Sequence, residues 1–283
     1  RLSAALVEDL LSHLQEVEKP FLTLVGMDEK DVSVTQHGVS VAVLAMMIGH
    51  ALDLPARDLR DIALGSLFHD IGKIKIPSQI LRKTTDLSAP EQNLLKLHTK
   101  YGVELVGLTD TFPLEAWPIV EQHHEYIDGS GYPKALKEPQ IDALAKIVAV
   151  VNAFDNLCHP LDISKSRSPH HALSYMYRSM KGKLPEREMK VMIKMMGVYP
   201  PGTIVLLSDQ RLGIVMSVNS DSLLCPNVLV YDADVPRLEA PILTLEPDKL
   251  SISKVIKIQA LPQHVAEYLN PRAQVSYHIQ GKP

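Results

Sequence analysis

Five histidines of this chain lie within apolar helical patterns, and this arrangement limits how the chain can fold. They are His37, His69, His98, His123 and His124, and they come from four separate predicted helices. A buried imidazole needs a partner for each ring nitrogen. One such histidine is usually satisfied within a core, but five are more simply satisfied together by a shared metal cluster. The fold is therefore expected to bring distant parts of the chain to one point.

The segment that anchors this expectation is His69-Asp70-Ile71-Gly72-Lys73, at the end of an otherwise apolar helix. The Asp70 carboxylate has two oxygens with which to bridge a pair of cations. Lys73 lies about one turn away, so its ammonium can face an anion held by those cations. Imidazoles combined with a carboxylate favour Fe, Mn, Zn or Ni over Ca or Mg. The competing interpretation of this pair alone is a helix end with ordinary polar residues.

Hydrophobic periodicity predicts a mainly α chain with a β-rich end. The helices are predicted over 2–25 (with a break at Pro20), 32–54, 58–68, 115–126 and 141–158, with another starting at a Ser88–Glu91 capping box and two more between Ser168 and Gly197. After Gly197, four short β-type runs begin at Thr203, Gly213, Val228 and Val255. A short helix is predicted over 261–269, and the last dozen residues are expected to be loosely held.

These patterns divide the chain into four parts. They are an N-terminal helical segment over 1–30, a helical domain over 31–198, a small β module over 199–262 and a tail over 263–283. The expected fold class is an α-helical bundle followed by a small C-terminal β module.

Composition excludes several classes of partner. The hydrophobic content of 46% and charged content of 22% are typical of an ordinary water-soluble protein. A net charge of -4 gives no basis for binding duplex nucleic acid or an anionic membrane. No apolar run reaches membrane-spanning length.

Cys158 and Cys225 form no zinc-type spacing and fit a reducing cytoplasm. Because the chain starts at Arg1, an upstream sensory or membrane region is expected to be missing.

Two motifs together resemble the HD-GYP family of bacterial signalling enzymes. The first is His69-Asp70-Ile71-Gly72-Lys73, and the second combines His123-His124-Glu125 with Asp128-Gly129-Ser130-Gly131-Tyr132-Pro133. The helix with Glu91, His98 and Gly102 and the Gly197–Gly202 segment are also similar, so the resemblance covers roughly residues 30–210. It implies an all-α, HD-type, metal-dependent phosphodiesterase that hydrolyses the second messenger cyclic di-GMP.

The resemblance also implies roles for individual residues. The metal ligands would be His37, His69, Asp70, His98, His123, His124 and the residue at position 152, with Asp70 bridging. Lys73 would contact the scissile phosphate. The Gly131-Tyr132-Pro133 loop would shape the substrate mouth and dock partner proteins that carry a GGDEF motif.

The sequence departs from the family pattern at several positions. The family's first aspartate on the helix over 147–158 is Asn152 here, a weaker donor, whereas the second, Asp155, is retained and is expected to orient a ligand histidine. The glutamate of trinuclear members is Ser33, so two divalent ions are expected, with Fe or Mn favoured and Ni or Zn as alternatives. The two phosphate-gripping positions are Leu161 and Ser164, for which Lys165 and Arg167 are predicted to substitute.

The predicted function is hydrolysis of cyclic di-GMP by a metal-activated water. The alternative is a degenerate HD-GYP domain that binds the dinucleotide or a GGDEF partner with little turnover. An HD-type nucleotidase is a third reading, but it leaves the Tyr132 loop unexplained. Glu125 and Asp128 are interpreted as loop structure. The remaining polar-segment histidines are interpreted as solvated surface (His13, His50, His159, His170 and His171), and the methionine-rich run over 189–196 as packing or a homodimer contact.

Overall fold

The computed structural model describes residues 2–16, 21–25, 34–218, 222, 224–246, 248–269 and 276–280. The chain divides into two compact units. The first comprises Arg1–Gln15, Ser33–Ser166 and Tyr175–Val191, and the second comprises Glu16–Val32, Arg167–Ser174 and Met192–Pro283. The expected mainly α fold with a small β-rich part is confirmed. The four-part division predicted from the sequence stays a prediction.

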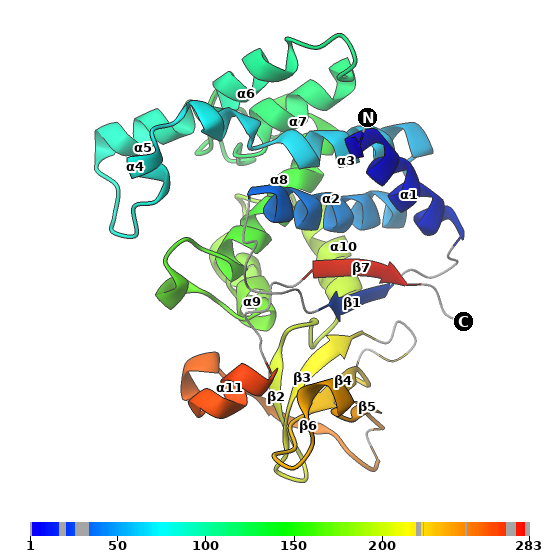
Figure 1. The fold of residues 1–283 in the computed structure, drawn as a ribbon. Coiled ribbons are helices and arrows are strands. Elements are labelled where there is room, and N and C mark those ends of the chain that lie inside the picture. Colours follow the sequence, from blue (N-terminus) through cyan, green and yellow to red (C-terminus); the bar gives the residue numbers. More distant parts are fainter. Residues whose placement is uncertain are drawn as a thin grey trace. The chain divides into compact units, whose positions relative to one another are not determined.

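The first unit is helical (Figure 1). Its α-helices are α1 (Leu2–Glu16), α2 (Val34–Ala51), α3 (Ala56–Phe68), α4 (Ser78–Leu81), α5 (Ala89–Lys96), α6 (His98–Val106), α7 (Trp117–Gln122) and α8 (Ala143–Cys158). Short 3-10 turns lie between them: η1 (Ile71–Lys75), η2 (Leu114–Ala116), η3 (Glu138–Gln140) and η4 (Ile163–Lys165). The division between the units passes through α9 (Pro169–Ser179) and α10 (Glu186–Met196).

Helix α2 lies at the centre of this bundle and packs on α3 and α8. Every residue from Val41 to Ile48 is buried, as expected for a helix that is apolar on all sides. Its approach to α3 is close because Gly38 has no side chain: a Cβ there would lie 3.0 Å from the Leu67 carbonyl oxygen. The N-terminal part of α2 is thereby held against the C-terminal end of α3, where the His69–Asp70 pair follows.

Three sequence expectations for the helices need correction. The capping box at Ser88 and Glu91 does start a helix, but this helix ends before Leu97, and a second helix starts at His98. The connection between Ile74 and Asp86, for which the sequence predicts no helix, contains the short helix α4. The helix predicted over 2–25 ends at Glu16, and Phe21–Val25 is strand β1, which follows the break expected near Pro20.

The second unit contains one antiparallel sheet. Its strands are β1, β2 (Ile204–Leu207), β3 (Leu212–Ser217), β4 (Asn227–Val230), β5 (Ile242–Thr244), β6 (Ile252–Val255) and β7 (Ser276–Gln280). The main path runs β5-β4-β3-β1-β7, and β2 pairs with both β3 and β6. In register, Val205 pairs with Gly213, Ile214 with Leu229 and Thr23 with His278. The α11 helix (Gln263–Leu269) confirms the predicted closing helix.

The core of this sheet is aliphatic, formed by Val205, Leu207, Val215, Val228, Val230 and Leu245. The β module predicted over 199–262 supplies five of the strands, but β1 and β7 come from outside it. The expectation that the last dozen residues are loosely held was wrong for Ser276–Gln280, because all five residues of β7 pair with β1. Backbone pairing over a large sequence separation leaves no local pattern that marks either partner.

Candidate metal centre

The predicted ligands are supplied by helix ends and helix faces of the first unit. His37 lies in the first turn of α2, His69 and Asp70 link α3 to η1, His98 starts α6, and His123 and His124 follow α7. His69, Asp70, His98 and His123 are all buried. The close packing of η1 on α6 depends on Gly72, since a Cβ there would lie 1.9 Å from the His98 carbonyl oxygen. Four segments far apart in sequence thus supply the ligands around the Asp70 carboxylate.

Backbone carbonyls fix the orientation of three of these imidazoles. The Nδ1–H of His69 donates to Ser66 O at 2.6 Å, and that of His98 donates to Leu95 O at 2.7 Å. The Nδ1–H of His123 is shared between the carbonyl oxygens of Ile119 and Val120, each at 3.1 Å. A carbonyl oxygen only accepts, so Nδ1 must carry the proton in all three rings. Each Nε2 therefore presents a lone pair.

Two of these nitrogens converge with an oxygen of Asp70, and none of the three atoms has a hydrogen to donate. His98 Nε2 and His123 Nε2 are 3.2 Å apart, and they lie 3.4 and 3.8 Å from Asp70 Oδ1. This carboxylate oxygen is buried and has no hydrogen-bond partner within the described residues. Buried acceptors left in this way are unfavourable unless a cation is present among them. Metal–nitrogen bonds of about 2.0–2.1 Å are compatible with nitrogens this close together, so the donor set fits a bound metal ion.

A second group forms on the other oxygen of the same carboxylate. His37 Nε2 lies 3.1 Å from His69 Nε2 and 3.7 Å from Asp70 Oδ2. The Nδ1–H of His37 donates to Asp155 Oδ2 at 2.6 Å. Burial alone would lower the pKa of His37, but the hydrogen bond and negative charge of Asp155 raise it. A proton and a metal ion therefore compete for the lone pairs of this group, so its metal affinity should rise with pH.

Both groups have the composition of a transition-metal site. One comprises Asp70, His98, His123 and His124, the other His37, His69 and Asp70, and in each the ligand atoms lie within 4.8 Å of one another. The cluster is thus able to bind metal ions. Burial lowers the pKa of His69 to about 4 and lowers the pKa values of His98, His123 and His124 as well. These rings are neutral at pH 7, as metal ligands must be.

The carboxylate is ionised for a different reason. Burial by itself would raise the pKa of Asp70, but neighbouring His69 and Lys73 hold that pKa well below its ordinary value. Lys73 Nζ donates to Asp70 Oδ2 at 2.5 Å. The ammonium predicted to face the substrate thus lies next to the shared carboxylate.

Asn152 and Asp155 lie one turn apart on α8. The side-chain oxygen of Asn152 lies 3.2 Å from His37 Nε2 and accepts a hydrogen bond from Asn156 Nδ2 at 2.8 Å. Asp155 is bonded to His37 on one oxygen and to His159 Nδ1 on the other, at 3.1 Å. Its carboxylate is thus in a position to orient His37. His159, expected on the solvated surface, has this buried partner.

The loop after α7 is fixed by close backbone packing, a ring stack and hydrogen bonds to two carboxylates. A Cβ on Gly131 would lie 2.3 Å from Tyr126 N, so only glycine fits there. The ring of Tyr132 stacks on His124 with centroids 4.6 Å apart. Glu125 accepts the backbone N–H groups of Lys134 and Leu136, and Asp128 accepts both donors of Ser130. Both acidic residues therefore serve loop structure, as the sequence indicated.

Lys165, another predicted substrate residue, forms its ion pairs with acidic residues that are not part of the cluster. Lys165 Nζ pairs with Asp86 at 3.2 Å and its side chain is 60% exposed. Arg167 belongs to the second unit, so its role stays a prediction. Ser33 and the side chain of His13 lie outside what the structure describes.

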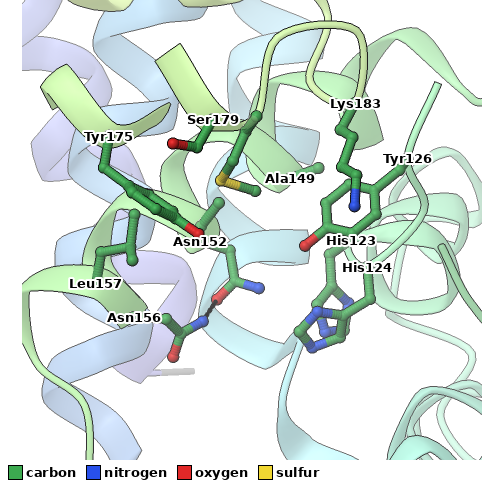
Figure 2. Close-up of a pocket in the computed structure, with 12 residues that line it drawn as sticks. His123, His124, Tyr126, Ala149, Asn152, Asn156, Leu157, Tyr175, Ser179 and Lys183 are labelled. Carbon is green, nitrogen blue, oxygen red and sulfur yellow. Dashed lines mark hydrogen bonds between the residues drawn. The ribbon is translucent and has the colours of Figure 1, made fainter. Parts of the chain in front are cut away.

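A cavity of about 430 Å³ adjoins the cluster and includes residues that the sequence reasoning missed (Figure 2). His123, His124 and Asn152 form one part of its wall. The remaining lining residues are Tyr126, Ala149, Ala153, Asn156, Leu157, Tyr175, Ser179, Met180 and Lys183. The one signal in the sequence is the spacing of Asn156, which lies one turn beyond Asn152 on the same helix. Lys183, in the turn between α9 and α10, had no such signal.

Comparisons with known proteins show the family of this chain. A family model described as an HD domain matches residues 21–184. The cyclic di-GMP phosphodiesterase PA4108 of Pseudomonas aeruginosa is 32% identical over 228 residues, which cover 80% of this chain and 54% of that protein. The cyclic di-GMP phosphodiesterase response regulator RpfG of Xanthomonas campestris pv. campestris is 31% identical over 186 residues, 64% of this chain and 49% of that protein. The chain thus spans about half the length of these curated relatives.

A solved structure of an HDGYP-type protein is also similar to this chain. Bd1817, a HDG"Y"P protein from Bdellovibrio bacteriovorus, matches with a TM-score of 0.50 and 26% identity over 59% of this chain and 53% of that one. Within the described residues, none of the helices has the length and apolar character needed to cross a membrane. The resemblance to HD-GYP proteins predicted from the motifs is confirmed. With more than half of its length matched by the family model and an imidazole–carboxylate cluster at its centre, the chain belongs to the HD domain family.

Proposed function

We propose that this chain is a metal-dependent phosphodiesterase that hydrolyses cyclic di-GMP. The observation that carries the proposal is the shared carboxylate: Asp70 belongs to both ligand groups, and its buried Oδ1 lacks a hydrogen-bond partner within the described residues. The names of PA4108 and RpfG supply the substrate class. We further propose two ions, Fe or Mn, held by His37, His69, Asp70, His98, His123, His124 and Asn152.

The residues of the chain contribute binding, orientation and charge. Divalent cations, when bound, supply Lewis acidity and an activated water nucleophile. Lys73 is the group next to Asp70 that can neutralise charge on a phosphoryl oxygen. Asp155 and the backbone carbonyls hold the imidazoles in the tautomer that leaves Nε2 available. Tyr132, stacked on His124 and followed by Pro133, forms the mouth that orients the dinucleotide.

The test is metal analysis of the purified protein combined with hydrolysis of cyclic di-GMP in excess Mn²⁺ or Fe²⁺. We expect about two ions per chain and turnover that is lost in Asp70→Asn. The control is His264→Gln, an exposed histidine of the second unit. A protein that retains no ions and cleaves no cyclic di-GMP would contradict the proposal.

A second candidate is a domain that binds cyclic di-GMP or a GGDEF partner without turning it over. It is favoured by Asn152, whose neutral oxygen stands at a ligand position and already accepts a bond from Asn156. Tight binding of cyclic di-GMP with no linear product under any metal would support this candidate instead. For either candidate function, we further propose that the chain docks GGDEF proteins, forms a homodimer and is located in the cytoplasm.

A further inference from the structure

The cavity beside the cluster has an uneven distribution of charge. Lys183 is the one lysine or arginine among its lining residues. No aspartate or glutamate lines it. The remaining polar groups are the two amides, two phenols and one serine hydroxyl. Such a cavity attracts an anion that also has flat apolar parts.

The backbone around Lys183 is fixed. Its N–H donates to Met180 O at 3.0 Å, and its carbonyl accepts Ile127 N–H at 2.8 Å. An isolated β-bridge between Lys181 and Leu184 closes this turn. Figure 2 shows the side chain extending into the cavity beside the Tyr126 ring, whose centroid lies 5.7 Å from Nζ.

The three lysines considered for substrate differ in their partners. Lys73 Nζ is 2.5 Å from Asp70 Oδ2, and Lys165 Nζ is engaged by Asp86 and Asp162 on the surface. Lys183 forms no ion pair in the part of the chain that the structure describes. Its ammonium contacts the Tyr126 ring and interacts with the Asp128 carboxylate only at longer range. Of these three lysines, Lys183 is thus the one whose ammonium is not already held by a carboxylate.

We propose that Lys183 binds the second phosphodiester of cyclic di-GMP, the one that is not being hydrolysed. This inference rests on the proposed function. Cyclic di-GMP has two phosphodiesters joined by two nucleosides, so when one lies at the cluster the other must occupy neighbouring space. The cavity has the volume of an ordinary small-molecule site, and its tyrosines and aliphatic residues suit a nucleoside. Lys183 then takes the role predicted for Lys165 and Arg167.

The first test compares Lys183→Met, Lys183→Arg and Lys165→Met in the Mn²⁺-loaded protein. Because Lys183 is placed on the phosphate that does not react, its loss should raise the KM for cyclic di-GMP roughly tenfold with kcat changed less than about twofold. Lys183→Arg should restore most of the KM, and Lys165→Met should match the wild type. A fall in kcat with an unchanged KM, or an equal effect of Lys165→Met, overturns the inference.

The second test does not require turnover. Lysines of the Mn²⁺-loaded wild type are acetylated with and without the bis-phosphorothioate analogue of cyclic di-GMP, and the modified sites are identified by mass spectrometry. We expect the analogue to protect Lys183 and not Lys165. Protection of Lys183 without hydrolysis of cyclic di-GMP would refute the proposed enzyme and sustain this inference. If cyclic di-GMP is hydrolysed while Lys183 stays unprotected and the KM of Lys183→Met is unchanged, the proposed enzyme is supported and the inference on Lys183 is refuted.

Discussion

Asn152 stands where a carboxylate would complete the ligand group around His37 and His69. Its oxygen lies 3.2 Å from His37 Nε2, and α8 holds it buried. An amide oxygen is a neutral donor, so it neither offsets the charge of a cation nor binds it as strongly as a carboxylate does. The residue therefore limits metal retention more than it affects the fold.

Asn152→Asp should increase metal retention by about tenfold or more, since added ligand charge strengthens divalent-ion binding, and should raise the hydrolysis rate with it. Metal content after dialysis and initial rates measure both effects. The matched control is Asn156→Asp, which adds the same charge one turn further along the same helix and should not change metal content. No change in Asn152→Asp would mean that this residue does not contact the metal.

For individual residues, the sequence predicted the site best where a residue able to bind metal lies within an apolar pattern. Five histidines in apolar helical patterns were enough to predict their convergence, because buried imidazoles require partners. The family resemblance led to the expectation that Asp155 orients a ligand histidine, and its carboxylate accepts a hydrogen bond from His37 Nδ1 at 2.6 Å. Lys183 was not predictable, because a lysine in a polar turn has no feature that distinguishes it from a solvated surface residue.

Among the elements, the contact between η1 and α6 has the least room for change. A Cβ on Gly72 would lie 1.9 Å from His98 O and 2.4 Å from Gly102 N, both backbone atoms that cannot rotate away. These two elements carry Asp70 and His98. Their separation therefore sets the distance between the carboxylate and one of its imidazoles.

Gly72→Ala should force η1 away from α6 and reduce both stability and metal binding. Overpacking of this kind costs roughly 1–3 kcal/mol or more. Urea unfolding and metal content measure the two effects. Gly182→Ala is the control: it has a left-handed backbone but nothing within 4 Å, so it should lower stability somewhat and leave metal content intact. Equal metal loss in both variants would contradict the role assigned to Gly72.

The start of α5 gives a prediction for pH. Hydrogen bonds from Lys83 and Ser88 lower the pKa of Glu91 to about 2. Because the folded pKa lies below its ordinary value, this carboxylate stabilises the fold fully above about pH 4.5, and the contribution is lost as the pH falls toward 2. Glu91→Gln should therefore lower the melting temperature at pH 7, and the difference from wild type should shrink at pH 3. Glu104→Gln, which removes an exposed partner of Lys75, should change little at either pH.

The sequence predicted helices better than strands for a physical reason. Helical periodicity is local, so α2, α3 and α8 could be read from apolar spacing and proline positions. Strands β1 and β7 are stabilised by each other across more than two hundred residues, and short apolar runs are compatible with either helix or strand. The sheet therefore includes parts that its local sequence had assigned to a helix and to a tail.

At the scale of the whole molecule, the ligand cluster joins several segments of the first unit at one point. His37, His69, His98, His123 and Asn152 come from different elements, and each contributes one ligand atom or neighbour to a common centre. Ions that bind only the folded form stabilise it by mass action. The cluster is thus a structural centre of the first unit as well as its candidate reaction site.

Addition of Mn²⁺ to the chelator-treated protein at about 100 times Kd should raise the melting temperature by roughly 5–10 °C. Asp70→Asn should lose most of this increase, because both ligand groups contain Asp70. His264→Gln should retain it. The measurement is thermal unfolding followed by circular dichroism, and an equal shift in Asp70→Asn and wild type would show that Mn²⁺ acts elsewhere.

Sharing one carboxylate between two ligand groups also makes their occupancy interdependent. With one ion bound, Asp70 would offer the other ligand group a less basic oxygen, and that group would have a positive charge beside it. We therefore expect sequential loading, with a weaker second step. A singly loaded protein is then a distinct chemical species, and limited metal supply would set the fraction of chains that are fully assembled.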